Sequence, residues 1–302
     1  MKRIIVTGAG GYLGKMLVQK LLQEGHHVTA VDFHISSLED LKKDGLIVLQ
    51  ADLNSENIQD IFPENEYDSF YHLAWQGVNG PMKADPLIQW NNVRLALRCA
   101  QLANHFGCER FLCAGTIAER AVESLPHLEK TSGGMLYGTA KHCCHLMLET
   151  YCKNTGLNLV WMQFSNCFGP SNLTGNLISY TIEQLKNDTP ALFGPALQPY
   201  DFIYTDDLIE AVSRLGVMPN SSHCYFLGSG TPAVLREYLT EVGNLAGKPE
   251  LIKIGERADD GIRYDWKMLD NTPLIRDIGP YVTGTFSEKI LYTLENYKGG
   301  CK

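Results

Sequence analysis

The sequence lacks the features that mark a secreted, membrane-spanning or nucleic-acid-binding protein. No apolar run approaches the length of a membrane span, and the apolar run after Met1 is too short for a signal peptide. The nine cysteines are scattered without a paired framework, so we expect reduced thiols and a cytoplasmic location. The net charge of -8 argues against nucleic acid and a membrane surface as partners, but permits a nucleotide ligand.

Internal repeats, linkers and low-complexity tracts are also missing from the sequence. At 302 residues, the chain is long for one hydrophobic core and suits two closely packed lobes. We place a nucleotide-binding domain at residues 1–165 and a smaller, mainly substrate-binding lobe at 166–302. Segments around residues 200–228 are expected to return to the first domain.

The first fourteen residues, MKRIIVTGAGGYLG, organise the chain. The β-branched run 4–6 predicts a buried strand, glycines follow at once, and residues 12–22 have the apolar spacing of a helix. A strand, a glycine turn and a helix N-terminus together bind a pyrophosphate, because the backbone can approach the ligand and free N–H groups point at it. The residues that we expect to hold a dinucleotide here are Gly8, Gly11, Tyr12, Leu13 and Gly14.

Further strands alternate with helices, which predicts an α/β fold with a doubly wound parallel sheet. The expected strands cover 27–32, 46–50, 67–73, 110–114 and 159–163, and a long helix covers 86–106. Asp32 ends the second strand, where an acid can accept both adenosine ribose hydroxyls and repel a 2′-phosphate. This predicts NAD rather than NADP as the cofactor, although a solvated loop aspartate would fit the same pattern.

Tyr137 and Lys141 are spaced to share one face of a helix, which we expect to run from Tyr137 to about Thr155. A neighbouring ammonium favours the phenolate, so the tyrosine becomes a base that can take a proton from a sugar hydroxyl. Thr116 ends the fifth strand and could hydrogen-bond the same substrate oxygen. The alternative is an ordinary pair of surface residues.

These motifs occur in the order used by one family. They are Thr7-Gly8-x-x-Gly11-x-x-Gly14, Asp32, Asp52-Leu53, His72-Leu73-Ala74, Asn91, Thr116, Tyr137-x-x-x-Lys141, Asn166-x-Phe168-Gly169-Pro170 and Asp201-Phe202-x-x-x-Asp206-Asp207. The chain resembles the extended short-chain dehydrogenase/reductases, specifically the nucleotide-sugar epimerase/dehydratase branch, over nearly its whole length.

The resemblance implies a role for each matching residue. Tyr137 would be the acid/base, Lys141 would orient the nicotinamide ribose and lower the pKa of Tyr137, and Thr116 would polarise the reacting oxygen. The implied cofactor residues beyond the glycine turn and Asp32 are Asp52, Leu53, Leu73, Ala74, Trp75 and Asn91, together with Tyr137 and Lys141. The residues expected to contact the substrate are Trp75, Thr116, Asn166, Tyr200 and Arg257.

Three departures from the family pattern narrow the reaction. Dehydratases of this branch have an acid pair directly after the catalytic threonine, but here the first acid after Thr116 is Glu119. Elimination of water is therefore not expected, unless Glu119 reaches back. Tyr200 and Gln163 stand where relatives often have arginine, which weakens the case for a nucleoside diphosphate. Arg257 matches another family arginine, one that grips the diphosphate.

Two acidic or metal-binding patterns have simpler explanations. The run His142-Cys143-Cys144-His145 cannot close one tetrahedron, since adjacent helical residues point in different directions, so no metal is expected. Asp206-Asp207 is interpreted as the first turn of a helix, with Thr205 as its N-cap. Further along, Thr285-x-x-Glu288 predicts a capping box for the last helix, which is expected to run to about Tyr297.

The helices 86–106 and 137–155 are expected to build a homodimer, as the resemblance also implies. The second helix carries more apolar surface than one sheet face can cover. Its apolar residues are Leu146, Met147, Leu148, Tyr151 and the pair Cys143-Cys144. Coverage of this face by the second lobe is the alternative.

Together, the residues and the resemblance predict an NAD-dependent nucleotide-sugar epimerase, acting at C4 through transient oxidation to a ketosugar. One alternative is a 4-ketosugar reductase or sugar dehydrogenase that consumes its cofactor. Another is a non-catalytic NAD-binding sensor, against which the intact Thr116, Tyr137 and Lys141 argue.

Overall fold

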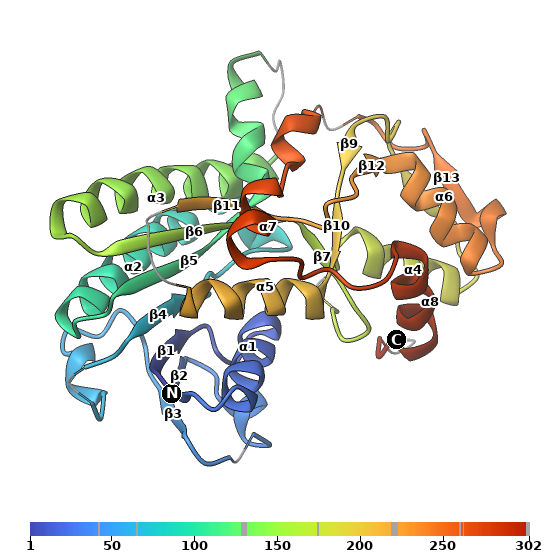
Figure 1. Ribbon diagram of the computed structural model, residues 1–302. Coiled ribbons are helices and arrows are strands. Elements are labelled where there is room, and N and C mark those ends of the chain that lie inside the picture. Colours follow the sequence, from blue (N-terminus) through green and yellow to red (C-terminus); the bar gives the residue numbers. More distant parts are fainter. Residues whose placement is uncertain are drawn as a thin grey trace.

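The computed structural model describes residues 1–41, 43–64, 66–127, 132–173, 175–218, 223–259, 261 and 263–299. A seven-stranded parallel sheet in the order β11-β6-β5-β4-β1-β2-β3 forms its larger part (Figure 1). Its strands are β1 (Arg3–Thr7), β2 (His27–Asp32), β3 (Leu46–Gln50), β4 (Ser69–His72), β5 (Arg110–Thr116), β6 (Asn158–Phe164) and β11 (His223–Leu227). The predicted doubly wound α/β fold is confirmed.

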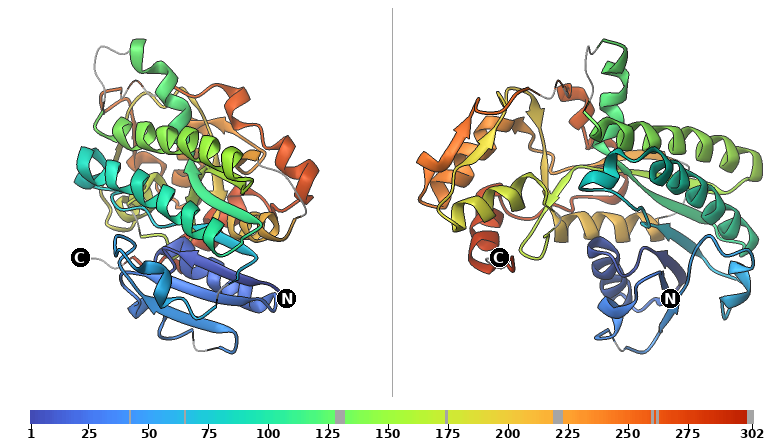
Figure 2. Two further views of the ribbon diagram at one scale, coloured as in Figure 1. Left: turned by 90° about the vertical axis from the view of Figure 1, so that its left-hand side faces the viewer. Right: turned by 180° about the vertical axis from the view of Figure 1, so that it is seen from behind.

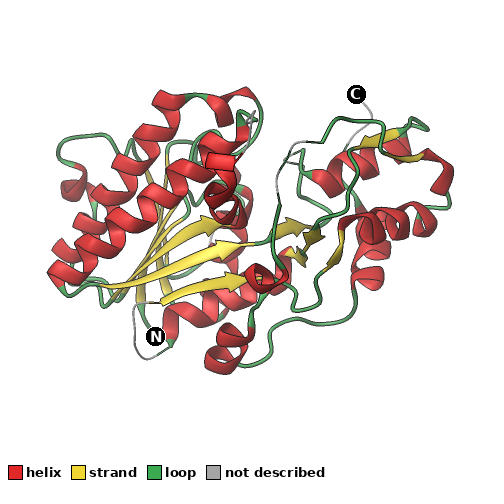
Figure 3. Ribbon diagram, turned by 90° about the horizontal axis from the view of Figure 1, so that it is seen from above, coloured by secondary structure: helices red, strands yellow, loops and turns green. Residues whose placement is uncertain are grey.

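Helices cover both faces of this sheet (Figure 3). On one face lie α2 (Pro86–His105) and α3 (Gly134–Thr155), and on the other lie α1 (Tyr12–Gln23) and α5 (Thr205–Val217). Successive residues of a strand point to opposite faces, so Ile4 and Val6 enter one core while Ile5 enters the other. All three are fully buried, as expected for a parallel strand covered on both sides.

Two predicted helix starts differ from the observed ones. Helix α3 begins at Gly134, not Tyr137, because buried Met135 donates its N–H to Ser132 and forms a turn earlier. Thr205 is the first residue of α5 and not its N-cap. Its hydroxyl donates to the carbonyl of Phe168 (2.9 Å), so it ties the helix to β7 (Asn166–Phe168) instead of satisfying the helix N–H groups.

The remaining elements form a smaller group beyond the ends of the sheet strands (Figures 2 and 3). They are α4 (Leu177–Lys186), β8 (Ala191–Phe193), β9 (Pro199–Tyr200), β10 (Phe202–Tyr204), β12 (Ala233–Val234), α6 (Leu235–Leu245), β13 (Ile252–Ile254) and α8 (Phe286–Asn296). Helix α7 (Thr272–Ile278) instead packs on the core of the large sheet beside β11 and α5. A third core cluster, with fully buried Ile182, Leu239 and Ile290 among its members, joins α4, α6 and α8. Thr285 and Glu288 form the predicted capping box of α8.

Short 3-10 helices complete the chain. They are η1 (Ser36–Leu38), η2 (Ile58–Ile61), η3 (Pro81–Ala84), η4 (Ile117–His127), η5 (Pro249–Leu251) and η6 (Trp266–Leu269). Two of them approach the site described below: η3 through Lys83, which lies near the Tyr137 ring, and η4 through Glu119, which contacts Thr116.

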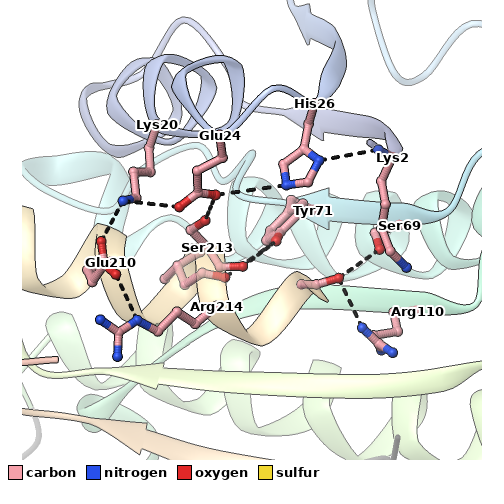
Figure 4. A network of polar contacts seen from close by, with 12 residues as sticks. Lys2, Lys20, Glu24, His26, Ser69, Tyr71, Arg110, Glu210, Ser213 and Arg214 are labelled. Atoms are coloured by element: carbon pink, nitrogen blue, oxygen red, sulfur yellow. Dashed lines mark hydrogen bonds and ion pairs between the residues drawn. The ribbon is translucent and has the colours of Figure 1, made fainter. Parts of the chain in front are cut away.

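A polar network fastens α5, which comes late in the chain, to α1 near its start (Figure 4). Lys20 pairs with Glu24 (3.0 Å) and with Glu210 on α5 (2.6 Å), and Glu210 also pairs with Arg214 (2.7 Å). Ser213 donates to Glu24. The helix that follows the glycine turn is therefore fixed to the second half of the chain.

Candidate active site

A cavity of about 660 Å³ opens at the carboxyl ends of the first strands, where ligands bind in parallel α/β sheets. Nine of the predicted cofactor residues line it: Gly8, Gly11, Asp32, Asp52, Leu53, Leu73, Ala74, Trp75 and Asn91. Gly8 has φ +73°, and a Cβ there would lie 2.5 Å from the backbone nitrogen of Ala74. Only glycine lets the turn after β1 come this close to the chain leaving β4.

Asp32 stands in the wall of this cavity with its carboxylate fixed by the backbone. One oxygen accepts the N–H of Gly10 (2.9 Å) and the other accepts the N–H of His34 (3.0 Å). Carboxylate oxygens have further acceptor sites, so ribose hydroxyls can still bind them. The cavity thus fits the adenosine end of a dinucleotide, with an anion where a 2′-phosphate would stand.

The other predicted residues of the glycine turn lie outside the lining of this cavity. The Tyr12 hydroxyl donates to Thr205 (3.1 Å), and Leu13 packs against the core between the sheet and α1. A Cβ on Gly14 would lie 2.0 Å from the carbonyl oxygen of Gly8, so this glycine allows α1 to pack closely on the turn. These three residues could therefore contact a phosphate only through their backbone N–H groups at the start of α1.

The far wall of the cavity is held by amides that the sequence did not single out. Asn92 accepts the N–H of Gln76 (3.0 Å) and donates to its carbonyl (2.7 Å), whereas the side chain of Asn91 accepts from Arg94. Buried Gln89 accepts from the indole of Trp75 (2.9 Å). The sequence offered one indication of the role of Asn92, which is that it directly follows Asn91, the asparagine that matches the family.

Thr116 and Tyr137 come together at the end of β5, as predicted, where the Thr116 side chain lowers the pKa of Tyr137. Burial has the larger effect and raises this pKa. Lys141 is also buried, but its ammonium donates to the carbonyl of Ala114 (2.5 Å) and lies 3.6 Å from the centre of the Trp75 ring. The role expected of Lys141 in lowering the pKa of Tyr137 stays a prediction.

Glu119 does reach back to Thr116, and three donors hold its carboxylate in place. It accepts the backbone N–H of Thr116 (2.6 Å), the indole N–H of Trp161 (2.9 Å) and the amide of Gln163 (3.2 Å). Burial raises its pKa. Gln163, in place of the family arginine, also accepts from Arg120 (2.8 Å). Glu119 therefore lies beside Thr116, which is the condition under which the sequence left elimination of water open.

A second cavity, of about 330 Å³, lies between β8, β9, α6 and the segment before η6. Tyr200 and Arg257 line it, and the guanidinium of Arg257 donates to the hydroxyl of Tyr180 (3.0 Å). Tyr200 donates to Asn166 (3.0 Å), so two of the predicted substrate residues contact each other directly. Arg257 is exposed, and its cationic group is available to an anionic ligand at the cavity mouth.

The two patterns that resembled metal sites have structural roles here. In the described part of the chain, no group of three or more His, Cys, Asp or Glu side chains could hold a metal ion. His145 stacks on Trp161, with ring centres 4.7 Å apart, and Cys144 is a buried residue of α3. Asp207 accepts hydrogen bonds from the backbone and side chain of Thr283.

The predicted interface residues of α3 divide into two groups. Leu148 and Cys144 are fully buried in the core against the sheet, so their assignment to a partner interface was wrong. Leu146 and Met147 are 51% and 39% exposed, so the described chain leaves a large part of each side chain uncovered. The described helices include none that is both long and apolar enough to cross a lipid bilayer.

Relatives of this chain carry the same organisation. A UDP-glucose 4-epimerase of Mycolicibacterium smegmatis is 24% identical over 98% of both chains. A UDP-N-acetylglucosamine 4-epimerase from Methanobrevibacter ruminantium M1 superimposes with a TM-score of 0.81 at 19% identity, over 98% of both chains. A UDP-glucuronic acid 4-epimerase from Bacillus cereus, solved with UDP-glucuronic acid and NAD, gives 0.78 at 21% identity, over 98% and 99%.

A family model extends the likeness to most of the chain, since it matches residues 4–225. This range contains the glycine turn, Asp32 and the group of Thr116, Tyr137 and Lys141. The family makes NAD the cofactor. The chain belongs to the NAD-dependent epimerase/dehydratase family of enzymes.

Proposed function

We propose that the protein is an NAD-dependent nucleotide-sugar epimerase that acts at C4 of the sugar. The observation that carries this proposal is the place of Tyr137 and Lys141 against Trp75, which lines the larger cavity, with Thr116 at the end of β5 beside Tyr137. A sugar linked to a nucleotide would reach the tyrosine from the second cavity, while the cofactor lies in the first.

The chain's own groups divide the work of proton transfer and binding. Tyr137 would take the proton from the C4 hydroxyl and later return it, and Thr116 would hold the same oxygen. NAD, when bound, supplies the hydride acceptor and donor. With NAD bound, the Lys141 ammonium would donate to a ribose hydroxyl, either in place of the Ala114 carbonyl or in addition to it. The cofactor residues proposed are those lining the larger cavity, with the backbone at Tyr12, Leu13 and Gly14.

On the substrate side, we assign the nucleotide to the second cavity and its diphosphate to Arg257. Asn166 and Tyr200 would contact the ligand as a hydrogen-bonded pair, and Trp75 would border the sugar, since its ring meets that of Tyr137 edge-on at 6.2 Å. This division also supports the two proposed domains, 1–165 and 166–302, with β11 and α5 returning to the first.

The test is a panel of nucleotide sugars with the purified protein, followed by NMR of the products. We expect inversion at C4 without net use of cofactor. Stoichiometric consumption of NAD or NADH would instead identify a sugar dehydrogenase or ketosugar reductase. Binding of NAD with no turnover of any sugar would identify a sensor and refute the proposal.

We also propose a homodimer built from α2 and α3 of each subunit. Leu87 and Trp90 of α2 are 77% and 60% exposed, and Leu146 and Met147 of α3 are exposed as well. Large apolar side chains gathered on two neighbouring helices favour an isologous four-helix contact. Light scattering at micromolar concentration should give a dimer mass that Leu146→Glu converts to the monomer mass.

The cytoplasmic location stays a prediction.

A further inference from the structure

Glu119 is a buried carboxylate beside the reacting groups, and no part of the proposed reaction uses it. It lies on η4, which packs against α3, and its carboxylate is held from two strands of the sheet. On β5 it accepts the backbone N–H of Thr116 (2.6 Å), and on β6 it accepts from Trp161 (2.9 Å) and Gln163 (3.2 Å). The sheet thus fixes the position of this carboxylate.

The donors around Glu119 require its ionised form. The three hydrogen bonds that described residues make to it all come from N–H groups, and an indole and a backbone amide can only donate. Gln163 is oriented the same way, because its carbonyl oxygen accepts from Arg120 (2.8 Å) and its NH2 group faces Glu119. A protonated carboxyl would direct its O–H at one of these donors and leave that N–H unsatisfied in the interior. The site therefore contains a buried negative charge.

The charge of Glu119 needs a buried partner of opposite sign. Within 4 Å, the described residues offer it one basic group, the His145 ring, whose Nδ1 lies 3.9 Å from the carboxylate. Burial lowers the pKa of His145 to about 4, so this ring is neutral near pH 7. A buried carboxylate without a compensating charge is costly and would take up a proton. The other titratable or charged groups near it are Arg120 of η4, Tyr137, Lys141 and Cys144 of α3, and Cys224 of β11.

Lys141 is the cation that burial places with this carboxylate, since Arg120 is partly exposed. The Lys141 ammonium donates to the carbonyl of Ala114 (2.5 Å), and Glu119 accepts the N–H of Thr116. Backbone groups two residues apart point to the same edge of a strand and lie about 7 Å apart along it. Burial lowers the pKa of Lys141 and Glu119 raises it, while burial raises the pKa of Glu119 and Lys141 lowers it. Each charge thus favours the ionised form of the other.

We infer that Glu119 is a positioning residue of this site, whose carboxylate is the counter-charge that keeps the buried Lys141 amine in its ammonium form at the end of β5. Without a compensating charge, burial would favour the neutral amine. The ammonium is the form that the role expected of Lys141 requires, both to donate to a ribose hydroxyl and to favour the phenolate of Tyr137. The inference therefore deepens the proposed function, because it names the group that maintains the charge of Lys141.

The test is a pair of NMR titrations of the protein that need no substrate. With lysine isotope-labelled at Cε, the signal missing from Lys141→Arg identifies Lys141, and its midpoint is followed against pH. In Glu119→Gln we expect this midpoint to fall by on the order of one to two pH units, for charges ~7 Å apart at an intermediate dielectric. Electrostatic coupling is reciprocal, so with glutamate isotope-labelled at Cδ the midpoint of Glu119 should rise by a similar amount in Lys141→Met.

Two variants separate this charge effect from a loss of packing. Glu119→Asp keeps the negative charge and should return the Lys141 midpoint toward the parental value. Glu149→Gln removes another carboxylate, one of α3 that pairs with Lys153 (2.8 Å), and should leave the Lys141 midpoint unchanged. If Glu119→Gln fails to fold, the titration of Glu119 in the parent and in Lys141→Met still decides, because it needs no change at Glu119.

An unshifted midpoint of Lys141 in Glu119→Gln, or of Glu119 in Lys141→Met, overturns the inference whether or not the protein is an epimerase. So does a shift in Glu119→Asp as large as that in Glu119→Gln, which would show that packing and not charge is responsible. Shifted midpoints together with no turnover of any nucleotide sugar would overturn the proposed function alone.

Discussion

The turn that admits the cofactor depends on one backbone position, and Gly8→Ala tests it. Gly8 has φ +73°, and an added Cβ would lie 2.5 Å from the nitrogen of Ala74 and 2.7 Å from the carbonyl carbon of Leu73. Both atoms belong to the main chain, which is itself held because Leu73 donates to the carbonyl of Thr7 (3.0 Å). Neither can turn away as a flexible side chain could.

Gly25 offers a matched control at the end of α1. It has φ +80°, and no atom of the described chain lies within 4 Å of its added Cβ. Gly25→Ala should therefore cost only the left-handed backbone conformation, about 1–2 kcal/mol of unfolding free energy. Gly8→Ala should cost this and a further ~1–3 kcal/mol for the collision, for a total of about 2–5 kcal/mol.

Urea unfolding of the two variants and the parent, in parallel, measures both losses. The collision also moves Ala74, which is part of the cavity wall. Calorimetric titration should therefore show that Gly8→Ala weakens NAD binding roughly tenfold or more, which is about 1.4 kcal/mol or more. NAD binding should be unchanged in Gly25→Ala. Equal destabilisation of the two variants, or parental NAD affinity in Gly8→Ala, would refute the reasoning.

The remaining predictions concern the cofactor, the chemistry and pH. The parent should bind NAD roughly a hundredfold more tightly than NADP, since charges ~4 Å apart at intermediate dielectric interact by a few kcal/mol; Asp32→Asn should narrow that gap, and titration with both cofactors decides it. Tyr137→Phe should keep NAD affinity but lose on the order of 10² to 10⁴ in turnover, and near-normal turnover would remove Tyr137 from the mechanism. Burial lowers the pKa of His72 to about 3 and of His145 to about 4, against ~6.5 in the unfolded chain. The free energy of unfolding is therefore highest above pH ~6.5, where these histidines are neutral in the unfolded chain as well. At pH 5 the unfolded chain binds protons that the folded chain does not, which lowers the free energy of unfolding by about 2 kcal/mol per histidine. Urea unfolding at pH 7 and pH 5 should show that the free energy of unfolding falls less in His145→Phe than in the parent. An equal fall in both proteins would contradict the lowered pKa of His145.

The sequence predicted best where local pattern and tertiary environment impose the same requirement. The strand at Leu46–Gln50 has the predicted bounds, and the capping box at Thr285 begins α8 as expected. The predictions that failed depended on neighbours distant in sequence. Thr205 looks like an N-cap locally, but its hydroxyl bonds the Phe168 carbonyl across two elements. Leu148 was expected at an interface, yet the sheet face under α3 buries it.

Sequence alone determined the order of elements, the glycine turn, Asp32 and the residues that meet at the end of β5. These follow from side-chain periodicity and from the rule that parallel strands deliver their carboxyl ends to one edge. Tertiary structure alone decided which charges meet. The sequence spacing places Lys141 on the helix face of Tyr137, and only the fold shows that its ammonium also meets the Ala114 carbonyl and the Trp75 ring. Electrostatic interaction depends on distance and burial in space, and neither is written in the spacing of residues along a chain.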